Sequence, residues 1–279
     1  MGDVRDVEVS YDGTRLLFSL RLPDIPNADP ADQNKWDIWE YDITADSLRR
    51  VTETDNTAKA GDDVAPHYLP DGRIIFTSTR LNGLVPCNNT GVDILHVMNA
   101  DGTGLHTISV NNVNEFDPAV LPDGRILYTR WEYVDRSQVD FHHLWTFNPD
   151  GTGQMPLFGN VLPMATLLDA KPIPDTSQVV VVHSGHMNYE HHGSISVIDL
   201  KNGPDNKKAE RRITKSGMYR DPYPLGRDGF LVADGPKLLL MDYQGRTETL
   251  LELSEEDQKA GLWIHEPRPV RPRPRERLI

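Results

Sequence analysis

The segment Leu69-Pro70-Asp71-Gly72-Arg73-Ile74-Ile75-Phe76-Thr77 recurs almost unchanged as Leu121-Pro122-Asp123-Gly124-Arg125-Ile126-Leu127-Tyr128-Thr129, 52 residues further along the chain. A weaker copy runs from Ser10 to Phe18. An Asp-Gly pair between two apolar, alternating runs is a strong signal for a tight β-hairpin turn, because the turn needs positive φ angles that Asp and Gly tolerate. Each copy therefore predicts a strand, a tight turn and a second strand.

A second motif follows the first and has its own copies. The run from Ile94 to Gly104 matches the run from Leu144 to Gly153, and both contain Asp-Gly-Thr-Gly. Weaker versions end at Asp42, Asp199 and Asp242. We interpret the aspartates that end these runs as turn residues that accept hydrogen bonds from the backbone just ahead of them; they are Asp42, Asp101, Asp150, Asp199 and Asp242.

Two motifs in a fixed order, with a period near 50, indicate a β-propeller. The predicted fold class is all-β, a propeller of four-stranded antiparallel blades. Five blades are visible, starting near Val4, Asp62, Glu115, Leu167 and Arg220. Closure as five blades and membership of a six-bladed disc both stay open. A short helix is predicted at 254–260, with Ser254 as its cap.

The predicted domain boundary lies near the C-terminal end. Residues 1–262 are assigned to a propeller whose repeat resembles that of TolB-like proteins, and residues 263–279 to a linker or tail rich in Pro and Arg. Proline removes backbone donors and favours the polyproline II conformation, so this segment is not expected to be a sheet strand.

Composition narrows the classes of partner. The formal net charge of −13 over 279 residues argues against nucleic acid, whose phosphates need clustered Lys and Arg. No run approaches the roughly 18 apolar residues of a membrane-spanning helix, and no secretory signal is visible. The single cysteine, Cys87, excludes an internal disulfide. The predicted partner is a protein, or adjacent domains of the same parent protein.

The connections between the second and third strand of a blade are the longest loops. They run over 21–35, 80–92, 130–143 and 183–193, and long loops on a rigid scaffold concentrate binding residues. A ligand or partner is expected on this long-loop face. Its candidate residues are Arg130, Trp131, Glu132, Tyr133, Asp135, His142, His143 and Tyr189. In the alternative interpretation, Trp131 and Tyr133 pack between blades and the acids are solvated.

The same loops hold residues that could bind a metal ion. Thiolate and imidazole are the usual zinc ligands, and the candidates are Cys87, His183, His186, His191 and His192. No paired spacing such as Cys-x-x-Cys is present, so several unrelated loops would have to converge. The alternative is a free thiol and polar loop residues that satisfy one another.

The repeat resembles that of TolB-type propellers up to about Leu253. A narrower resemblance is carried by Gly83–Cys87, Thr129–Arg136, Leu144–Thr152 and His192–Ile195, which are similar to the propeller domain of hydrazine synthase alpha-subunit-like proteins. That resemblance implies a large periplasmic or otherwise extracytoplasmic protein, and a haem and zinc site to which the propeller contributes. Only Cys87 matches that site. Without a Cys-x-x-Cys-His motif, a c-type haem would have to be held by a neighbouring domain.

Two functions follow as expectations. The first is a non-catalytic binding or scaffold propeller within a larger extracytoplasmic protein. The second is the propeller part of a multidomain haem and zinc redox protein, with Cys87 and the loop histidines contributing to a metal site. A hydrolase is disfavoured because no Gly-x-Ser-x-Gly motif is present. No activity is expected of the isolated chain.

Overall fold

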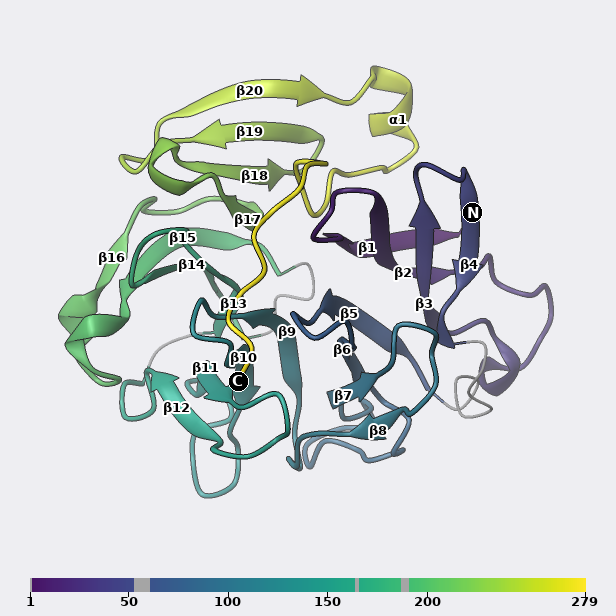
Figure 1. Cartoon of the computed structure of the whole chain (residues 1–279), viewed down its shortest axis with the longest axis horizontal. Coiled ribbons are helices and arrows are strands. Elements are labelled where there is room, and N and C mark those ends of the chain that lie inside the picture. The colour runs from purple at the N-terminus through teal and green to yellow at the C-terminus, as the bar shows by residue number, and fades with distance from the viewer. Residues whose placement is uncertain (1, 53–60, 164–165, 187–190) are drawn as a thin grey trace. The chain divides into compact units, whose positions relative to one another are not determined.

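A computed structural model describes residues 2–52, 61–163, 166–186 and 191–279. The chain divides into two compact units. The first unit contains residues 1–118 and 269–278, and the second contains residues 119–268 and Ile279. Each unit is built almost entirely from antiparallel strands (Figure 1).

The first unit contains two four-stranded sheets, each with its strands in chain order. One sheet is formed by β1 (Asp3–Val9), β2 (Arg15–Arg21), β3 (Trp36–Asp42) and β4 (Ser47–Arg50). The other is formed by β5 (Asp63–Tyr68), β6 (Ile74–Ser78), β7 (Ile94–Met98) and β8 (His106–Thr107). A single short helix, η1 (Pro30–Asp32), lies between β2 and β3.

The remaining strands follow the same plan in one linked sheet. Its first four are β9 (Glu115–Val120), β10 (Ile126–Trp131), β11 (His142–Phe147) and β12 (Met155–Phe158). The next four are β13 (Thr166–Pro172), β14 (Gln178–Ser184), β15 (Gly193–Asp199) and β16 (Glu210–Arg212). The last four are β17 (Tyr219–Pro224), β18 (Phe230–Asp234), β19 (Lys237–Met241) and β20 (Thr247–Glu252).

Successive sets of four in the linked sheet meet through one residue pair each. His142 of β11 pairs with Thr166 of β13 in parallel, and Gly193 of β15 pairs with Tyr219 of β17. Three short 3-10 helices are also present, η4 (Leu200–Asn202), η5 (Lys207–Ala209) and η6 (Gly226–Asp228). The predicted all-β class and the four-stranded antiparallel sheets are confirmed. The number of blades and their closure stay predictions.

The tight turns form as the repeats predict. Gly72 and Gly124 of the first motif have φ of 93° and 94°, and Gly102 and Gly151 of the second have φ of 85° and 84°. The predicted turn aspartates accept hydrogen bonds from backbone amides two residues ahead, at Thr44, Thr103, Thr152, Lys201 and Gln244. The predicted helix is α1 (Glu255–Lys259), and Ser254 caps it by accepting from the amide of Asp257 at 3.1 Å.

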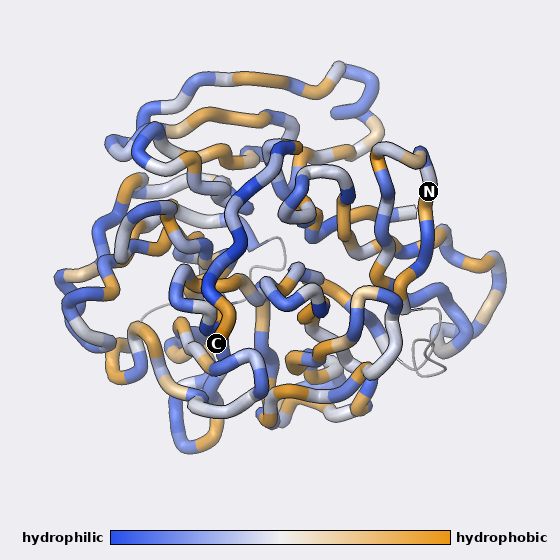
Figure 2. The backbone as a smooth tube through the Cα atoms, viewed as in Figure 1, coloured by the Kyte–Doolittle hydropathy of each residue, from blue (hydrophilic) through white to orange (hydrophobic). Residues whose placement is uncertain are grey.

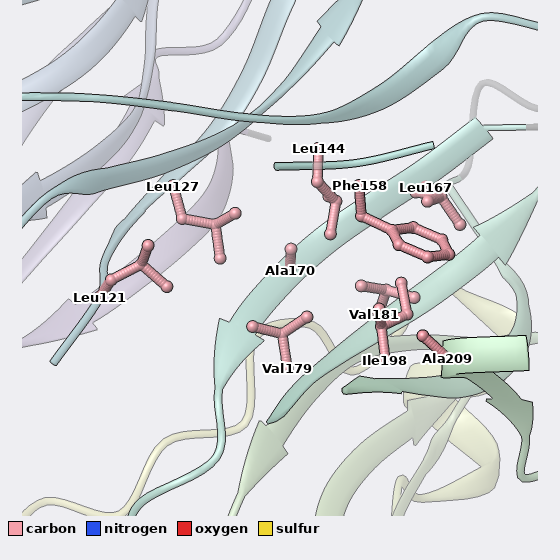
Figure 3. Close-up of a cluster of buried hydrophobic side chains, with 10 residues drawn as sticks. All are labelled: Leu121, Leu127, Leu144, Phe158, Leu167, Ala170, Val179, Val181, Ile198 and Ala209. Atoms are coloured by element: carbon pink, nitrogen blue, oxygen red, sulfur yellow. The ribbon is translucent and has the colours of Figure 1, made fainter. Parts of the chain in front are cut away.

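Each unit has its own apolar core. In the second unit, Leu127 and Leu144 on β10 and β11 pack with Phe158, and all three are fully buried. Val179 and Val181 on β14 extend the same cluster (Figure 3). In the first unit the core contains Leu17, Ile38, Ile74 and Phe76. Burying an aliphatic or aromatic side chain of this size stabilises a fold by roughly 1.5–3 kcal/mol, so these clusters hold each unit without disulfides.

The first strand of each set of four contains a residue with positive φ, and in four of the five sets the register with the second strand shifts there, at a bulge. Four of the five are aspartates; the residues are Asp6, Ala65, Asp117, Asp169 and Asp221. Asp tolerates positive φ better than most residues because its short polar side chain bonds locally. Asp6 uses its Oδ2 to accept from the amide of Ala65 at 2.9 Å, so the bulges connect neighbouring sheets inside the first unit.

The segment that ends the chain packs on the first unit. The amide of Arg273 donates to the carbonyl of Tyr11 at 2.9 Å, and its guanidinium pairs with Glu8 at 2.6 Å. Tyr11 in turn donates from its hydroxyl to Glu276 at 2.6 Å. Figure 2 shows this segment as mainly hydrophilic. Residues 269–278 are therefore held by polar contacts to β1 and the turn that follows it, and the predicted domain boundary at 262/263 stays a prediction.

Among the described residues, no helix has both the length and the apolar character needed to cross a membrane.

Candidate functional site

An aromatic–histidine cluster lies in the second unit, where β10 ends and β11 begins. We define it as Trp131, Tyr133, His142 and His186. Trp131 is the last residue of β10 and His142 is the first of β11, and the two are direct partners in the antiparallel register. His186 lies two residues beyond the end of β14. The cluster thus joins two of the long loops predicted from the sequence.

The register of the sheet explains why His186 reaches this place. His142 pairs with Thr166, and Thr166 pairs with Ser184 on β14. The chain continues two residues past Ser184 to His186. Nδ1 of His186 lies 3.3 Å from Nε2 of His142.

The rings of the cluster are stacked. The indole of Trp131 lies parallel to the ring of His142, with centroids 5.1 Å apart, and parallel to Tyr133 at 5.6 Å. His186 is tilted against both, with its centroid 4.9 Å from that of His142 and 5.6 Å from that of Trp131. Trp131 and His142 are buried, whereas Tyr133 and His186 are half-buried. The cluster therefore has a fixed inner part and an outer part within reach of solvent.

The loop between β10 and β11 is braced from within. The indole Nε1 of Trp131 donates to the carbonyl of Gln138 at 3.0 Å, and the amide of Glu132 donates to the carbonyl of Phe141 at 2.8 Å. Glu132 also forms an ion pair with Arg136, whose guanidinium stacks on Phe141 at 4.0 Å. These contacts hold the loop in one arrangement and so fix Trp131.

Burial keeps two histidines of this region uncharged. It lowers the pKa of His142 to about 3, with a further contribution from the neighbouring His186 and His143. Burial, followed by the positive charge of Arg136, lowers the pKa of His143 to about 4. The ring of His143 packs edge-on against Phe141. Both imidazoles are therefore neutral bases at neutral pH, although only His142 contacts the cluster.

The lowered pKa of His143 predicts how the stability of the protein depends on pH. In the unfolded chain His143 takes up a proton near pH 6.5, whereas in the folded protein it does so only near pH 4. Stability is therefore lost as the pH falls from about 7 towards 4, because only the unfolded state binds that proton. We expect His143→Gln to reduce the loss of unfolding free energy between pH 7 and pH 5 by about 2 kcal/mol.

The measurement is urea unfolding at both pH values in a chelator-containing buffer. Exposed His106 is the control, since His106→Gln should leave the pH dependence as it is in the wild type. An equal pH dependence in His143→Gln and the wild type would show that His143 is not a buried neutral base.

The other residues predicted for the long-loop face have separate roles. Arg130 is half-buried and stacks on Trp145 at 4.7 Å. Asp135 is exposed, with φ of 57°. Tyr189 lies outside the described residues. The structure therefore brings three predicted residues of this face into the cluster, Trp131, Tyr133 and His142, and adds His186 from the metal candidates.

The remaining metal candidates each lie in their own surroundings. Cys87 belongs to the first unit and is exposed. Nδ1 of His183 lies 3.0 Å from the carboxylate of Glu210, and Nε2 of His183 lies 2.8 Å from the guanidinium of Arg212. His191 and His192 are half-buried, and the carbonyl of His192 accepts from Ser184 at 2.8 Å. A joint site of Cys87 and the loop histidines stays a prediction.

Sequence reasoning missed a carboxylate cluster, formed by Asp169, Asp221 and Glu266. One carboxylate oxygen of each lies within 4.8 Å of the other two. Burial alone would raise the pKa of Asp221, yet hydrogen bonding and charge from His265, together with the amide of Glu266, lower it. Glu266 forms an ion pair with Arg268. Because cationic side chains of the protein already face these acids, we interpret the cluster as structural.

A signal for this cluster was present in the sequence. Asp117, Asp169 and Asp221 recur at intervals of 52 residues, and proline follows Asp117, Asp221 and Glu266. Asp169, Asp221 and Glu266 all have φ between 44° and 52°. A repeated acidic residue before proline could therefore have marked the bulge position.

No protein-family profile matches the chain. Among curated proteins it is similar to the hydrazine synthase subunit alpha of Kuenenia stuttgartiensis, with 28% identity over 152 residues, which cover 52% of this chain and 18% of that protein. Among solved structures, hydrazine synthase of the same organism matches 99% of this chain and 41% of its own, with 19% identity and a TM-score of 0.79. A TolB-type protein of Agrobacterium tumefaciens matches 90% and 81%, with 16% identity and a TM-score of 0.59.

These similarities support a propeller domain of the predicted type. The chain spans about a fifth of the curated relative and about two fifths of the solved chain that it matches. At this level of identity the solved structures inform the fold, and the site has to be argued from the residues of this chain.

Proposed function

We propose that this chain is the propeller domain of a larger extracytoplasmic protein, in which it binds a protein partner or an adjacent domain as a non-catalytic scaffold. The binding surface in this proposal is made by the loops that follow the second strand of each set of four. The fold similarity to hydrazine synthase, which extends over nearly all of this chain but less than half of that one, supports the larger parent.

Exposed apolar side chains carry the proposal. They recur in three successive long loops: Leu22 and Ile25 between β2 and β3, Leu81 and Leu84 between β6 and β7, and Val134 and Val139 between β10 and β11. Leu84 and Val134 are 58% and 60% exposed. Apolar side chains that recur on exposed loops favour a protein interface, because their burial on binding is the main source of affinity. The turns that precede β2, β6 and β10, at the other end of these strands, are tight Asp-Gly turns, and Asp12, Asp71 and Asp123 accept a backbone amide two residues ahead.

Site-specific photo-crosslinking tests the proposal. A photo-crosslinking amino acid replaces Leu84 in the protein made by its own host, and a matched variant carries it at Asp71. Both positions are exposed, and they lie beyond opposite ends of β6. We expect a specific crosslinked product from position 84 that is absent from position 71 and is reduced by Leu81→Asp in the same loop. Equal products from both positions, or none from either, would refute the binding surface.

A second candidate function follows from the similarity to hydrazine synthase subunit alpha, and its residue in this chain is Cys87. Its thiol is exposed on the loop between β6 and β7, close to the bridge between Leu84 and Gly91. Within the described residues, the one set of three potential ligand groups that lie together does not include Cys87. In this second function, Cys87 would supply one ligand to a haem or zinc site that another domain completes.

The metal content of the protein purified from its host tests this second function. Zinc or haem that is near-stoichiometric in the wild type and is lost in Cys87→Ser would support it. Content that does not depend on Cys87 would remove this residue from the site and leave the binding function as the proposal.

A further inference from the structure

The pair His142 and His186 has a geometry that the binding function does not use. Nε2 of His142 and Nδ1 of His186 lie 3.3 Å apart. Two nitrogens bound to one tetrahedral zinc ion at about 2.0–2.1 Å are separated by about 3.3–3.4 Å, whereas adjacent positions of an octahedron would bring them to about 2.9 Å. The observed separation matches tetrahedral chelation, and without an ion the same two nitrogens are close enough to share a hydrogen bond.

The sheet sets this separation. His142 begins β11, which pairs with β13, and β14 brings the chain back antiparallel to β13. The two imidazoles therefore come from segments whose backbones are fixed by hydrogen bonds. Trp131 is stacked on His142 and tilted against His186, and its own indole is held by the carbonyl of Gln138. Ligands whose rings are already oriented by packing lose little freedom when they bind an ion.

The surroundings of the pair favour a neutral imidazole ligand. His142 is 4% exposed, and within the described residues its Nδ1 has no hydrogen-bond partner. Burial at this depth disfavours a protonated ring, which leaves the lone pair of Nε2 able to bind an ion. His186 is half-buried, so an ion has a path from solvent to its nitrogen. The carboxylate of Asp140 lies near enough for its charge to act on His186.

We propose that His142 and His186 chelate a divalent transition-metal ion, with Zn²⁺ as the ion whose geometry they fit. Imidazole is a ligand that suits zinc and its neighbours in the first transition series. Two protein ligands leave two tetrahedral positions for water or for a group from a partner. The site is thus an open one, unlike the closed four-ligand sites that hold folds together. This inference goes beyond the proposed partner binding and does not depend on it.

Metal titration of the purified chain, without a metal-binding tag, tests the site. Calorimetry with zinc chloride gives the stoichiometry, and the visible absorption of bound Co²⁺ reports a tetrahedral environment. We expect one ion per chain. His186→Gln, which alters a half-buried side chain, should weaken binding by at least about tenfold, and His142→Gln should do the same. His106→Gln is the matched control and should bind as the wild type does.

A second measurement covers the case in which His142→Gln fails to fold. Cu²⁺ quenches tryptophan fluorescence at short range, and Trp131 lies next to both imidazoles. We expect quenching that saturates at one equivalent in the wild type and is lost in His186→Gln. In Trp131→Phe the quenching should be lost while calorimetric binding persists. Stoichiometric binding that is unchanged in His186→Gln would overturn the proposal, and so would the absence of binding at millimolar zinc.

Discussion

Replacing Asp63 with alanine is expected to lower the free energy of unfolding by about 3–5 kcal/mol. Asp63 forms a bidentate pair with Arg80 at 2.7 and 2.8 Å, and their side chains are only 1% and 5% exposed. The hydroxyl of Ser78 donates to the same carboxylate at 2.6 Å. Removing the carboxylate takes the bidentate partner of the buried Arg80 guanidinium away, and this is the costly part of breaking such a pair.

Urea unfolding of the purified chain measures this effect. The matched control is Asp71→Ala, in the same unit, where the pair with Arg73 at 2.7 Å is partly solvated. Its loss should cost less than about 1 kcal/mol, because exposed ion pairs contribute little. The double replacement Asp63→Leu with Arg80→Met should recover most of the stability, since neither charge of this pair is then buried. Equal losses in Asp63→Ala and Asp71→Ala would show that burial of the pair does not matter.

The repeats allowed the local structure to be predicted well. Asp-Gly turns are decided by a few neighbouring residues, and the positive φ of Gly72, Gly102, Gly124 and Gly151 follows directly from them. The cap at Ser254 is equally local. The blade count and closure depend on how whole sheets are placed, and a repeat in the sequence does not determine that placement.

The candidate site could be predicted in part. The long loops and their aromatic and histidine residues follow from the spacing of the repeats. The meeting of His142 with His186 depends on the single bridge between β11 and β13 and on the register of β14, and no local pattern encodes these. The structure shows how Trp131 and Tyr133 pack, whereas their role as site residues stays a prediction. Trp131 is buried in a stack, and Tyr133 is its half-exposed outer member.

The alternation of Pro and Arg near the C-terminal end predicted that residues 263–279 are a linker or tail and not a sheet strand. It did not predict that residues 269–278 pack onto β1 and the turn after it. Those contacts join residues 265 positions apart, such as Tyr11 with Glu276 and Glu8 with Arg273. The composition of residues 263–279 predicts their conformation. Where they pack depends on the acidic and aromatic side chains that β1 and the turn after it offer to the arginines.

Arg273→Ala is expected to lower the free energy of unfolding of the first unit by about 2–3 kcal/mol. The guanidinium of Arg273 bridges Glu8 at 2.6 Å and Glu276 at 2.9 Å, and it stacks on the ring of Tyr11 at 4.0 Å. The side chain of Glu8 is 8% exposed. Truncation would remove a nearly buried ion pair and a cation–π contact together, and would leave Glu8 in a site with less compensating charge.

The measurement is chemical denaturation of the full chain, with limited proteolysis of residues 269–278 as a second readout. Arg271→Ala is the matched control, because Arg271 is exposed and lies two residues away on the same segment. It should change stability by less than about 0.5 kcal/mol. In a double-mutant cycle, Glu8→Ala with Arg273→Ala should lose less stability than the sum of the single losses. Strict additivity, or equal effects of Arg271→Ala and Arg273→Ala, would mean that the segment is not held through Glu8, and the polar contacts to the backbone of β1 and its turn would then have to hold it alone.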